Sequence, residues 1–260
     1  MKRSEVDRNK LSPMMAQYME IKDKYSEELV FYRLGDFYEM FFDDALIASR
    51  ELELTLTGRV AGLEERVPMC GVPHNNVKTY IEKLVNKGYR VAICEQLEDP
   101  KTTGNRMVKR GIVDVISKGT IADNDLLNER DSSYIASVLF FQDIINITIL
   151  DISTSYLASL SIPNNMDTLL NEILNYNIKE VVLLDNLNTA LIDLLKNTYN
   201  IEVTINSEFL TDKYTEFLST ILDVRVRSGV EHLFYYLSVR QLKDLSHINH
   251  LEIIKKNDYV

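Results

Sequence analysis

Apolar residues follow two different periods along the first 117 positions, and their alternation predicts a mixed α/β domain. Helical spacing begins after Ser12-Pro13, where a capping hydroxyl precedes a proline at the first helical position. The same spacing predicts helices over 37–52 and from Asn75-Asn76 to Gly88. Short apolar runs without that spacing predict buried strands at 29–32, 89–94 and 112–116. Strands that alternate with helices indicate a sheet with helices packed on it.

The second half of the sequence opens with strand patterns separated by short turns. These patterns predict an antiparallel meander of three strands, at 134–141, 144–152 and 156–162. Helical and strand patterns then alternate, with helices expected at 167–177, 189–199 and 230–245 and strands at 180–184 and 201–205. Residues 117–131 are polar and mostly aperiodic, so we place the domain boundary there.

The formal charge of −10 is unevenly distributed between the two halves. Residues 1–130 carry 20 Lys+Arg and 22 Asp+Glu, whereas residues 131–260 carry 9 and 17. A nucleic-acid binder concentrates basic residues on one surface, and the acidic second half is unlike one. Four basic residues with no acid among them fall within ten positions of the first half: Lys101, Arg106, Lys109 and Arg110. They indicate either a solvated loop or a segment that contacts phosphates.

The overall composition is that of a folded protein of ordinary type. A share of 45% hydrophobic and 26% charged residues excludes a largely disordered chain. No stretch approaches the ~18 uncharged apolar residues of a membrane span, and the first residues lack the apolar core of a signal peptide. Cys70 and Cys94 provide no disulfide or zinc framework. We therefore expect a cytoplasmic protein.

Signals for catalysis or metal binding are weak. The sequence contains neither a Gly-rich phosphate-binding loop nor a Gly-x-Ser-x-Gly elbow. His247 and His250 are spaced to share a helix face, but no third ligand lies nearby, so we expect no metal site and no catalytic residue. Asp143 and Asp151 lie near the predicted meander, where a two-metal nuclease places its carboxylates. The alternative is that they are a turn residue and a strand-end residue.

Residues 33–45 contain the strongest candidate chemistry. Asp36 fits the N-cap of the predicted second helix, and Glu39 then falls at its third position, as in a capping box. Phe37 lies off the centre of the apolar stripe, because acidic residues follow it at seven-residue intervals. Two alternatives remain open: Phe37 projects from the start of the helix, or it packs on Phe41 one turn later.

Five blocks in this region resemble the amino-terminal region of the MutS family of DNA mismatch-recognition proteins. They occur in the family's order, as LSPMMAQY (11–18), FYRLGDFYEMF (31–41), LTLTGR (54–59), VPMCGVPH (67–74) and GYRVAICEQLEDP (88–100). The likeness continues more weakly at 150–154, which resembles a strand of the family's connector domain. Two departures are Lys118, where the family has a proline, and Ser155-Tyr156, where it has Gly-Glu.

The resemblance implies a mixed-sheet α/β mismatch-binding domain at 1–117 and a linker at 118–131. It further implies a ribonuclease-H-like α/β connector domain without nuclease activity at 132–245, and the start of a following core region at 246–260. The implied partners are double-stranded DNA with mismatches or small loops, a downstream mismatch-repair protein and a second copy in a homodimer, with no membrane. ATP and Mg act in the full-length family, so we expect no cofactor in this part.

The resemblance also implies a mechanism. The family's Phe-x-Glu motif matches Phe37 and Glu39: the ring enters from the minor groove and stacks on a mispaired base, and the carboxylate contacts a base. A mispaired step is easier to deform than a paired one, so deformability provides the selectivity. We expect phosphate contacts from Arg59, Lys101, Arg106, Lys109 and Arg110. Met69 belongs either to a groove loop beside Phe37 or to the core.

Two other functions are weighed against mismatch binding. One is a metal-dependent nuclease on the second half, and the other is a protein-interaction module that has lost mismatch reading. The intact Phe37 and Glu39 argue against the second of these.

Overall fold

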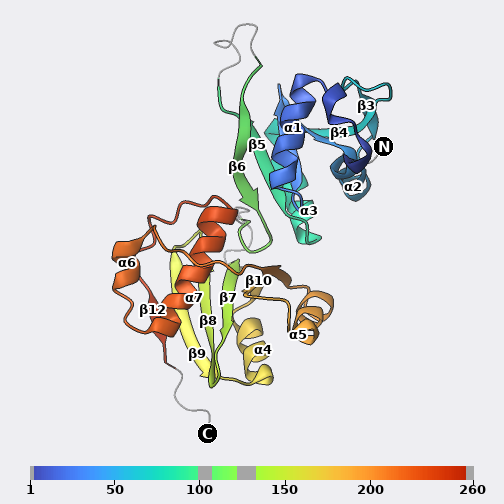
Figure 1. Ribbon diagram of the computed structural model, residues 1–260. Coiled ribbons are helices and arrows are strands. Elements are labelled where there is room, and N and C mark those ends of the chain that lie inside the picture. Colours follow the sequence, from blue (N-terminus) through green and yellow to red (C-terminus); the bar gives the residue numbers. More distant parts are fainter. Residues whose placement is uncertain (1–2, 99–106, 122–132, 256–260) are drawn as a thin grey trace. The chain divides into compact units, whose positions relative to one another are not determined.

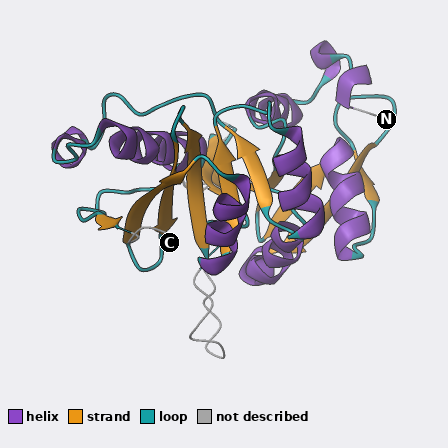
Figure 2. Cartoon of the chain, turned by 90° about the horizontal axis from the view of Figure 1, so that it is seen from below, coloured by secondary structure: helices purple, strands orange, loops and turns teal. Residues whose placement is uncertain are grey.

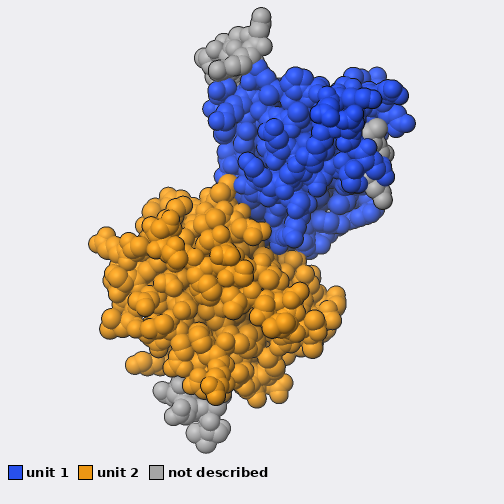
Figure 3. Space-filling view, in the orientation of Figure 1, with its two compact units in different colours: residues 1–117 blue, residues 118–260 orange. Residues whose placement is uncertain are grey.

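The computed structural model describes residues 3–98, 107–121 and 133–255. The chain divides into two compact units, residues 1–117 and residues 118–260 (Figure 3). Each unit has its own six-stranded sheet with helices packed on it (Figures 1 and 2). The predicted fold class, two successive mixed α/β units, is confirmed.

The sheet of the first unit mixes parallel and antiparallel strands. In spatial order the strands are β3 (Thr57–Arg59), β4 (Val67–Pro73), β2 (Phe37–Phe41), β1 (Leu29–Leu34), β5 (Val91–Gln96) and β6 (Arg110–Ile116). Only the β1–β5 pair is parallel, and the other neighbours are antiparallel. The central strands β1 and β5 are covered on both faces, which explains why their sequences read as continuous apolar runs.

The α-helices described in this unit cover the sheet; they are α1 (Pro13–Lys24), α2 (Phe42–Leu52) and α3 (Val77–Asn86). Short 3-10 turns lie at Arg3–Glu5, Arg8–Lys10 and His74–Asn76. Helix α1 begins after an extended Ser12 with proline at its first position, as the sequence predicts. It buries Met15, Tyr18 and Met19 against one face of the sheet. Helix α2 lies on the other face, where Cys70 Sγ donates to the carbonyl of Ala45 at 3.5 Å.

Residues 37–41 form strand β2 and not the first turn of a helix, so the prediction of a helix over 37–52 is wrong for its first five residues. Gly35 has φ +57° and forms, with Asp36, the two-residue turn of a β-hairpin in which Leu34 pairs with Phe37. Glycine with positive φ at the first turn position is typical of a type II′ turn. Asp36 is therefore a turn residue and Glu39 a strand residue, and the predicted capping box does not form.

The sheet of the second unit contains the predicted antiparallel meander. In spatial order its strands are β11 (Glu202–Ile205), β10 (Ile178–Leu183), β7 (Tyr134–Phe140), β8 (Ile144–Asp151), β9 (Tyr156–Pro163) and β12 (Glu252–Ile254). Strands β7, β8 and β9 are antiparallel, whereas β10, β11 and β12 each run parallel to a neighbour.

Helices cover both faces of this second sheet. On one face lie α4 (Met166–Asn175) and α5 (Thr189–Asp193), which continues as the π-turn η4 (Leu194–Thr198). On the other lie α6 (Thr215–Ser219) and α7 (Val224–Tyr235), which continues as the π-turn η5 (Tyr236–Arg240). The helix predicted at 230–245 therefore begins earlier and ends at Arg240. The chain turns away at Leu242, which has φ +59°.

Helix α7 approaches β8 closely at Gly229. A Cβ atom added there would lie 2.2 Å from Asn146 Oδ1 and 2.3 Å from Thr148 Oγ1. Both side chains are fully buried and hydrogen-bonded: Thr148 donates to Asn146 Oδ1 at 3.0 Å, and Asn146 donates to Ser159 Oγ at 2.9 Å. Only glycine fits between the helix and this polar group.

Both ends of the second unit include residues that the sequence analysis placed elsewhere. Lys118 Nζ donates to the carbonyl of Asn200 at 2.6 Å, so the first residue of the predicted linker is bonded to this unit. Residues 122–131 of that linker lie outside the described residues. Ile248 is buried in the core, and residues 252–254 form strand β12. Within the described residues, no helix has the length and apolar character needed to cross a membrane.

Candidate nucleic-acid interface

Phe37 occupies the end of β2, directly after the hairpin turn. Its side chain is 48% exposed, whereas the next residue, Tyr38, is 5% exposed and points into the core. Phe41 is fully buried in the cluster around α1. Strand residues four positions apart are separated by about 13 Å, so the alternative in which Phe37 packs on Phe41 over one helical turn is wrong. A large aromatic ring thus stands exposed at the end of a rigid strand.

Phe37 and Glu39 lie on the same face of the sheet, because side chains alternate along a strand. In register, Phe37 stands opposite Leu34 on β1 and Pro73 on β4, and Glu39 stands opposite Gly71 on β4. We call this end of the sheet, with Phe37, Glu39, Gly71 and Pro73, the Phe37 face. It combines an aromatic ring and a carboxylate two residues apart.

Glu39 forms an ion pair on this face. Its Oε2 accepts from Nη1 of Arg59 on β3 at 2.5 Å, and the two side chains are 17% and 35% exposed. The structure thus brings two of the predicted site residues together, although twenty positions separate them in the sequence. It gives Arg59 a carboxylate partner within the protein, which the sequence analysis did not foresee.

Met69 lies in strand β4, on the face of the sheet that carries Phe41 and Glu39, and its contact with DNA stays a prediction. It pairs in register with Phe41 on β2 and Thr57 on β3. Its side chain is partly buried and packs against the core cluster that contains Phe41. Of the two alternatives weighed for Met69, the structure supports the core.

Arg110 is anchored at the start of β6. Its Nε donates to the carbonyl of Arg33 at 2.8 Å and its Nη1 to that of Val108 at 3.2 Å. Its guanidinium carbon lies 5.1 Å from the centre of the Tyr32 ring, within the range of a cation–π contact. Burial raises the pKa of Tyr32 to about 12, so this ring is neutral at ordinary pH. The Tyr32 hydroxyl donates to Gln17 Oε1 at 2.6 Å and links the anchor to α1.

The remaining candidates for phosphate contacts are Lys109, Lys101 and Arg106. Lys109 is exposed, and its backbone N–H donates to Glu98 Oε2 at 3.3 Å. Lys101 and Arg106 lie outside the described residues. Among the described candidates, Lys109 is therefore the cation that stands most open to a phosphate.

The opposite face of the hairpin is fixed by a second set of contacts. The Tyr38 hydroxyl donates to Glu95 Oε1, and Arg33 Nη1 lies 3.7 Å from the same carboxylate oxygen. The Arg33 guanidinium carbon lies 5.4 Å from the centre of the Tyr38 ring. Burial, with the neighbouring Glu95, raises the pKa of Tyr38 to about 12. These contacts hold the end of the hairpin that carries Phe37.

The carboxylates considered for a nuclease have structural roles. Asp143 lies 3.3 Å from Arg225 Nη1 in an exposed ion pair. Asp151 Oδ1 accepts from the backbone N–H of Ser153 at 2.9 Å and from its hydroxyl at 2.6 Å, as in an Asx turn. Within the described residues, no three His, Cys, Asp or Glu side chains are grouped to hold a metal. These contacts agree with the alternative of a turn residue and a strand-end residue.

The histidine of helix α7, His232, is fully buried. His232 Nε2 donates to the carbonyl of Asn206 at 2.6 Å, and its Nδ1 accepts from the Ser137 hydroxyl at 2.7 Å. Burial lowers the pKa of His232, so the ring is neutral and joins α7 to β7. The apolar residues around it in α7 are the signal that could have indicated this position.

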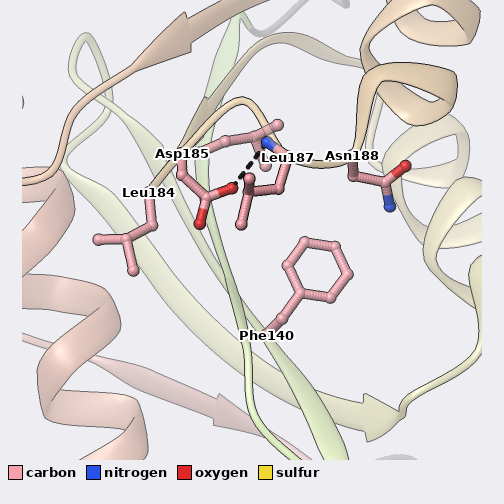
Figure 4. Close-up of a pocket in the computed structure, with 6 residues that line it drawn as sticks. Phe140, Leu184, Asp185, Leu187 and Asn188 are labelled. Carbon is pink, nitrogen blue, oxygen red and sulfur yellow. Dashed lines mark hydrogen bonds between the residues drawn. The ribbon is translucent and has the colours of Figure 1, made fainter.

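The second unit has an apolar hollow that the sequence analysis missed. It has a volume of about 230 Å³ and is lined by Phe140, Leu183, Leu184, Asp185, Leu187 and Asn188 (Figure 4). Leu187 is 82% exposed, and Phe140 and Leu184 are each 40% exposed. The Leu187 backbone N–H donates to the Asp185 carboxylate at 2.9 Å, which fixes the loop. We call this surface the Leu187 hollow.

Comparison with known families matches residues 12–125 to MutS domain I. All six strands of the first sheet and the whole Phe37 face fall inside the matched residues.

Curated relatives extend the likeness beyond domain I. The chain is 44% identical to DNA mismatch repair protein MutS of Clostridium beijerinckii over 251 residues, which cover 93% of this chain and 27% of that protein. It is 40% identical to the MutS of Listeria welshimeri over 251 residues, and 39% identical to that of Oceanobacillus iheyensis over 258 residues. Each of these two matches covers 96% of this chain and 29% of the relative. The chain therefore spans less than a third of the length of these MutS relatives.

Proposed function

We propose that the first unit binds double-stranded DNA at mismatches or small loops, as a step of DNA mismatch repair. The observation that supports this most directly is the half-exposed ring of Phe37, held at the end of a strand beside the Glu39 carboxylate. An aromatic ring in that position has no role in the core. The match of residues 12–125 to MutS domain I and the names of the relatives support the same function.

Phe37 acts in this proposal as a wedge from the minor groove. Stacking of its ring on a base contributes about 1–3 kcal/mol. Opening a base step costs a few kcal/mol and kinks the duplex. At a paired step the cost cancels the gain, whereas a mispaired step is already weakly stacked and costs less to open. The binding free energy therefore favours mispaired DNA without a sequence code.

Glu39 sharpens this preference. A carboxylate near the phosphates of an intact duplex is repelled by them, but at an opened pair it can hydrogen-bond to a base edge. We expect Glu39→Gln to bind matched DNA more tightly and to distinguish mismatches less well. Unchanged affinity of this variant for matched DNA would contradict the role of Glu39.

The phosphate contacts position the protein along the duplex without specifying its sequence. Lys109, Lys101 and Arg106 are our candidates. Arg110 is bonded to two backbone carbonyls and a ring, and it orders the start of β6 instead of reaching outward. Each phosphate contact that is removed is expected to weaken binding to all duplexes equally.

The decisive experiment is fluorescence anisotropy of this chain at low salt, with a G·T duplex and its matched twin. Wild type is expected to prefer the mismatch, and Phe37→Ala to lose that preference. Phe140→Ala is the matched control, because it removes a phenylalanine of similar exposure, 40%, from the other unit. Equal preference in wild type and Phe37→Ala, or equal binding of both duplexes by wild type, contradicts the proposal.

We propose for the second unit a contact with a downstream mismatch-repair protein. Its acidic composition disfavours DNA, and the Leu187 hollow exposes apolar side chains of the kind found at interface centres. Leu187→Asp is expected to weaken capture of that partner. Leu222→Asp, which changes a leucine that is 89% exposed outside the hollow, is expected to leave it intact. Equal capture by the two variants contradicts this assignment.

The remaining parts of the proposal concern the longer protein. By its likeness to MutS relatives, we propose that this chain acts in the cytoplasm as part of a homodimer whose ATP and Mg sites lie in other parts of the protein. We assign no catalytic step and no cofactor to this chain. In this proposal its residues bind the duplex, open a base step and position the protein along the DNA.

A further inference from the structure

Arg59 is the residue whose place in the structure departs most from its predicted role. From the sequence we expect Arg59 to contact a phosphate of the DNA. Its Nη1 instead lies 2.5 Å from Glu39 Oε2, in a pair whose side chains are only 35% and 17% exposed. A guanidinium paired with a carboxylate at this distance attracts a phosphate much less than a lone guanidinium does.

The path from Arg59 to Glu39 crosses strand β4. Arg59 is in register with Val67 on β4, and Glu39 is in register with Gly71, four residues further along the same strand. Gly71 has no side chain, so nothing at that position of β4 stands between the guanidinium and the carboxylate. The pair therefore joins β3 to β2 across β4, and a Cβ atom at Gly71 would meet Glu39 Cγ at 3.5 Å, an ordinary van der Waals distance.

The pair fixes a side chain that would otherwise sample several rotamers. A glutamate on an open strand face has three rotatable bonds, and a charge-assisted hydrogen bond selects among its conformations. Glu39 shares its face with Phe37, two residues away, so the selected conformation determines where the carboxylate stands relative to the ring. Arg59 also offsets the negative charge that Glu39 brings toward the phosphates.

We propose that Arg59 is a positioning residue for Glu39 and not a phosphate ligand. It holds the carboxylate beside Phe37 and thereby determines how strongly the site distinguishes mispaired from matched duplexes. This inference rests on the proposed function of Phe37 and Glu39. Arg59 and Glu39 then act together as one ion pair beside Phe37.

The salt dependence of DNA binding distinguishes a positioning role of Arg59 from a contact with a phosphate. A phosphate contact releases counterions, so its removal lowers the slope of log affinity against log salt by about 0.9. We expect Arg59→Gln to leave that slope unchanged and to reduce the mismatch preference about tenfold, the effect of losing one hydrogen bond to a charged group. Lys109→Gln is the matched control: we expect it to lower the slope and leave the preference unchanged.

A double-variant cycle tests whether Arg59 acts through Glu39. In a Glu39→Gln background, we expect Arg59→Gln to cause no further loss of mismatch preference, because the partner is already gone. We expect Arg59→Lys, which keeps the charge and loses the planar fork, to restore the preference only in part. Thermal unfolding of each variant confirms that the first unit is folded in every comparison.

Two results would overturn the inference. One is an Arg59→Gln variant with a lower salt slope and an unchanged mismatch preference, which would make Arg59 a phosphate ligand. The other is that the effects of Arg59→Gln and Glu39→Gln on the mismatch preference add fully, which would show that Arg59 does not act through Glu39. Retention of the preference by Phe37→Ala is a different failure, because it contradicts the proposed function itself whatever Arg59 does.

Discussion

The buried ion pair between Lys22 and Asp44 holds three elements of the first unit together. Lys22 Nζ lies 2.9 Å from Asp44 Oδ1, and the side chains are 7% and 3% exposed. Asp44 Oδ2 also accepts from the Val30 backbone N–H at 3.0 Å and from the Tyr18 hydroxyl at 3.3 Å. Lys22 donates in addition to the carbonyl of Glu28 at 2.6 Å. The pair thus joins α1, α2 and β1, the strand that carries the hairpin.

Lys22→Met removes the ammonium and leaves the Asp44 carboxylate buried with two hydrogen bonds. Removing one partner of a buried pair costs about 3–5 kcal/mol, a large share of the roughly 5–15 kcal/mol that holds a domain folded. The double variant Lys22→Met/Asp44→Asn removes both charges. We expect it to lose less stability than the two single losses combined, because neither charge is then left uncompensated.

The loss of stability in Lys22→Met also depends on pH, and the burial of Asp44 determines the direction of this dependence. Burial raises the pKa of Asp44, and the Lys22 ammonium opposes that shift. Without Lys22 the pKa of Asp44 in the folded chain rises further above its unfolded value. The folded variant then binds a proton more tightly than the unfolded chain, so protonation restores stability as the pH falls through the folded pKa. The deficit is greatest near neutral pH and shrinks on acidification.

Urea unfolding monitored by circular dichroism at several pH values measures this deficit. Because a chain of two units need not unfold in one step, hydrogen exchange of peptides from 13–52 assigns the loss to the first unit. Lys24→Met is the matched control, an exposed lysine on the same helix, and we expect it to change stability by less than about 0.5 kcal/mol. A loss in Lys22→Met no larger than the control's, or one that does not shrink with falling pH, refutes the reasoning.

Three further predictions follow from close approach, burial and backbone conformation. Gly229→Ala is expected to destabilise the second unit by about 1–3 kcal/mol or more, and unchanged hydrogen-exchange protection of α7 would contradict the close approach. Burial raises the thiol pKa of Cys70 and Cys94 to about 12. Iodoacetamide is therefore expected to label them only after denaturation. Rapid labelling of the folded chain would contradict this prediction. Gly35→Ala is expected to lower the free energy of unfolding by about 1–2 kcal/mol, because Gly35 has a φ of +57°. Gly35→Asn is expected to lower it less, because asparagine tolerates a positive φ better than alanine does. Equal melting temperatures of the two variants would argue against the turn.

Local patterns in the sequence were sufficient to predict the helices and strands whose burial is uniform or strictly periodic. The start of α1 followed from Ser12-Pro13, and β1 and β5 followed from apolar runs, because strands covered on both faces contain few polar residues. The meander followed from three strand patterns with short turns. The motif resemblance, and not any local pattern, singled out Phe37 and Glu39 among many exposed or charged residues.

Periodicity does not predict the secondary structure of a short segment that fits two periods equally well. In residues 37–41, aromatic residues four apart suggested a helical turn, but the positive φ of Gly35 closes a hairpin and the segment pairs with β1 and β4. A five-residue apolar segment does not contain enough positions to distinguish a period of 3.6 from a period of 2. Strand pairing, which is a contact between distant segments, decided the outcome.

The sequence by itself thus determined the succession of two α/β units and the presence of an aromatic ring and a carboxylate two residues apart. Only the tertiary structure decided that Arg59 faces Glu39 across β4, that Arg110 is bonded to β1, and that Lys22 is buried against Asp44. Each of these pairs joins residues at least twenty positions apart. Periodicity reports which face of an element is buried, whereas the partner of a charged side chain depends on strand register and helix packing, which no local pattern encodes.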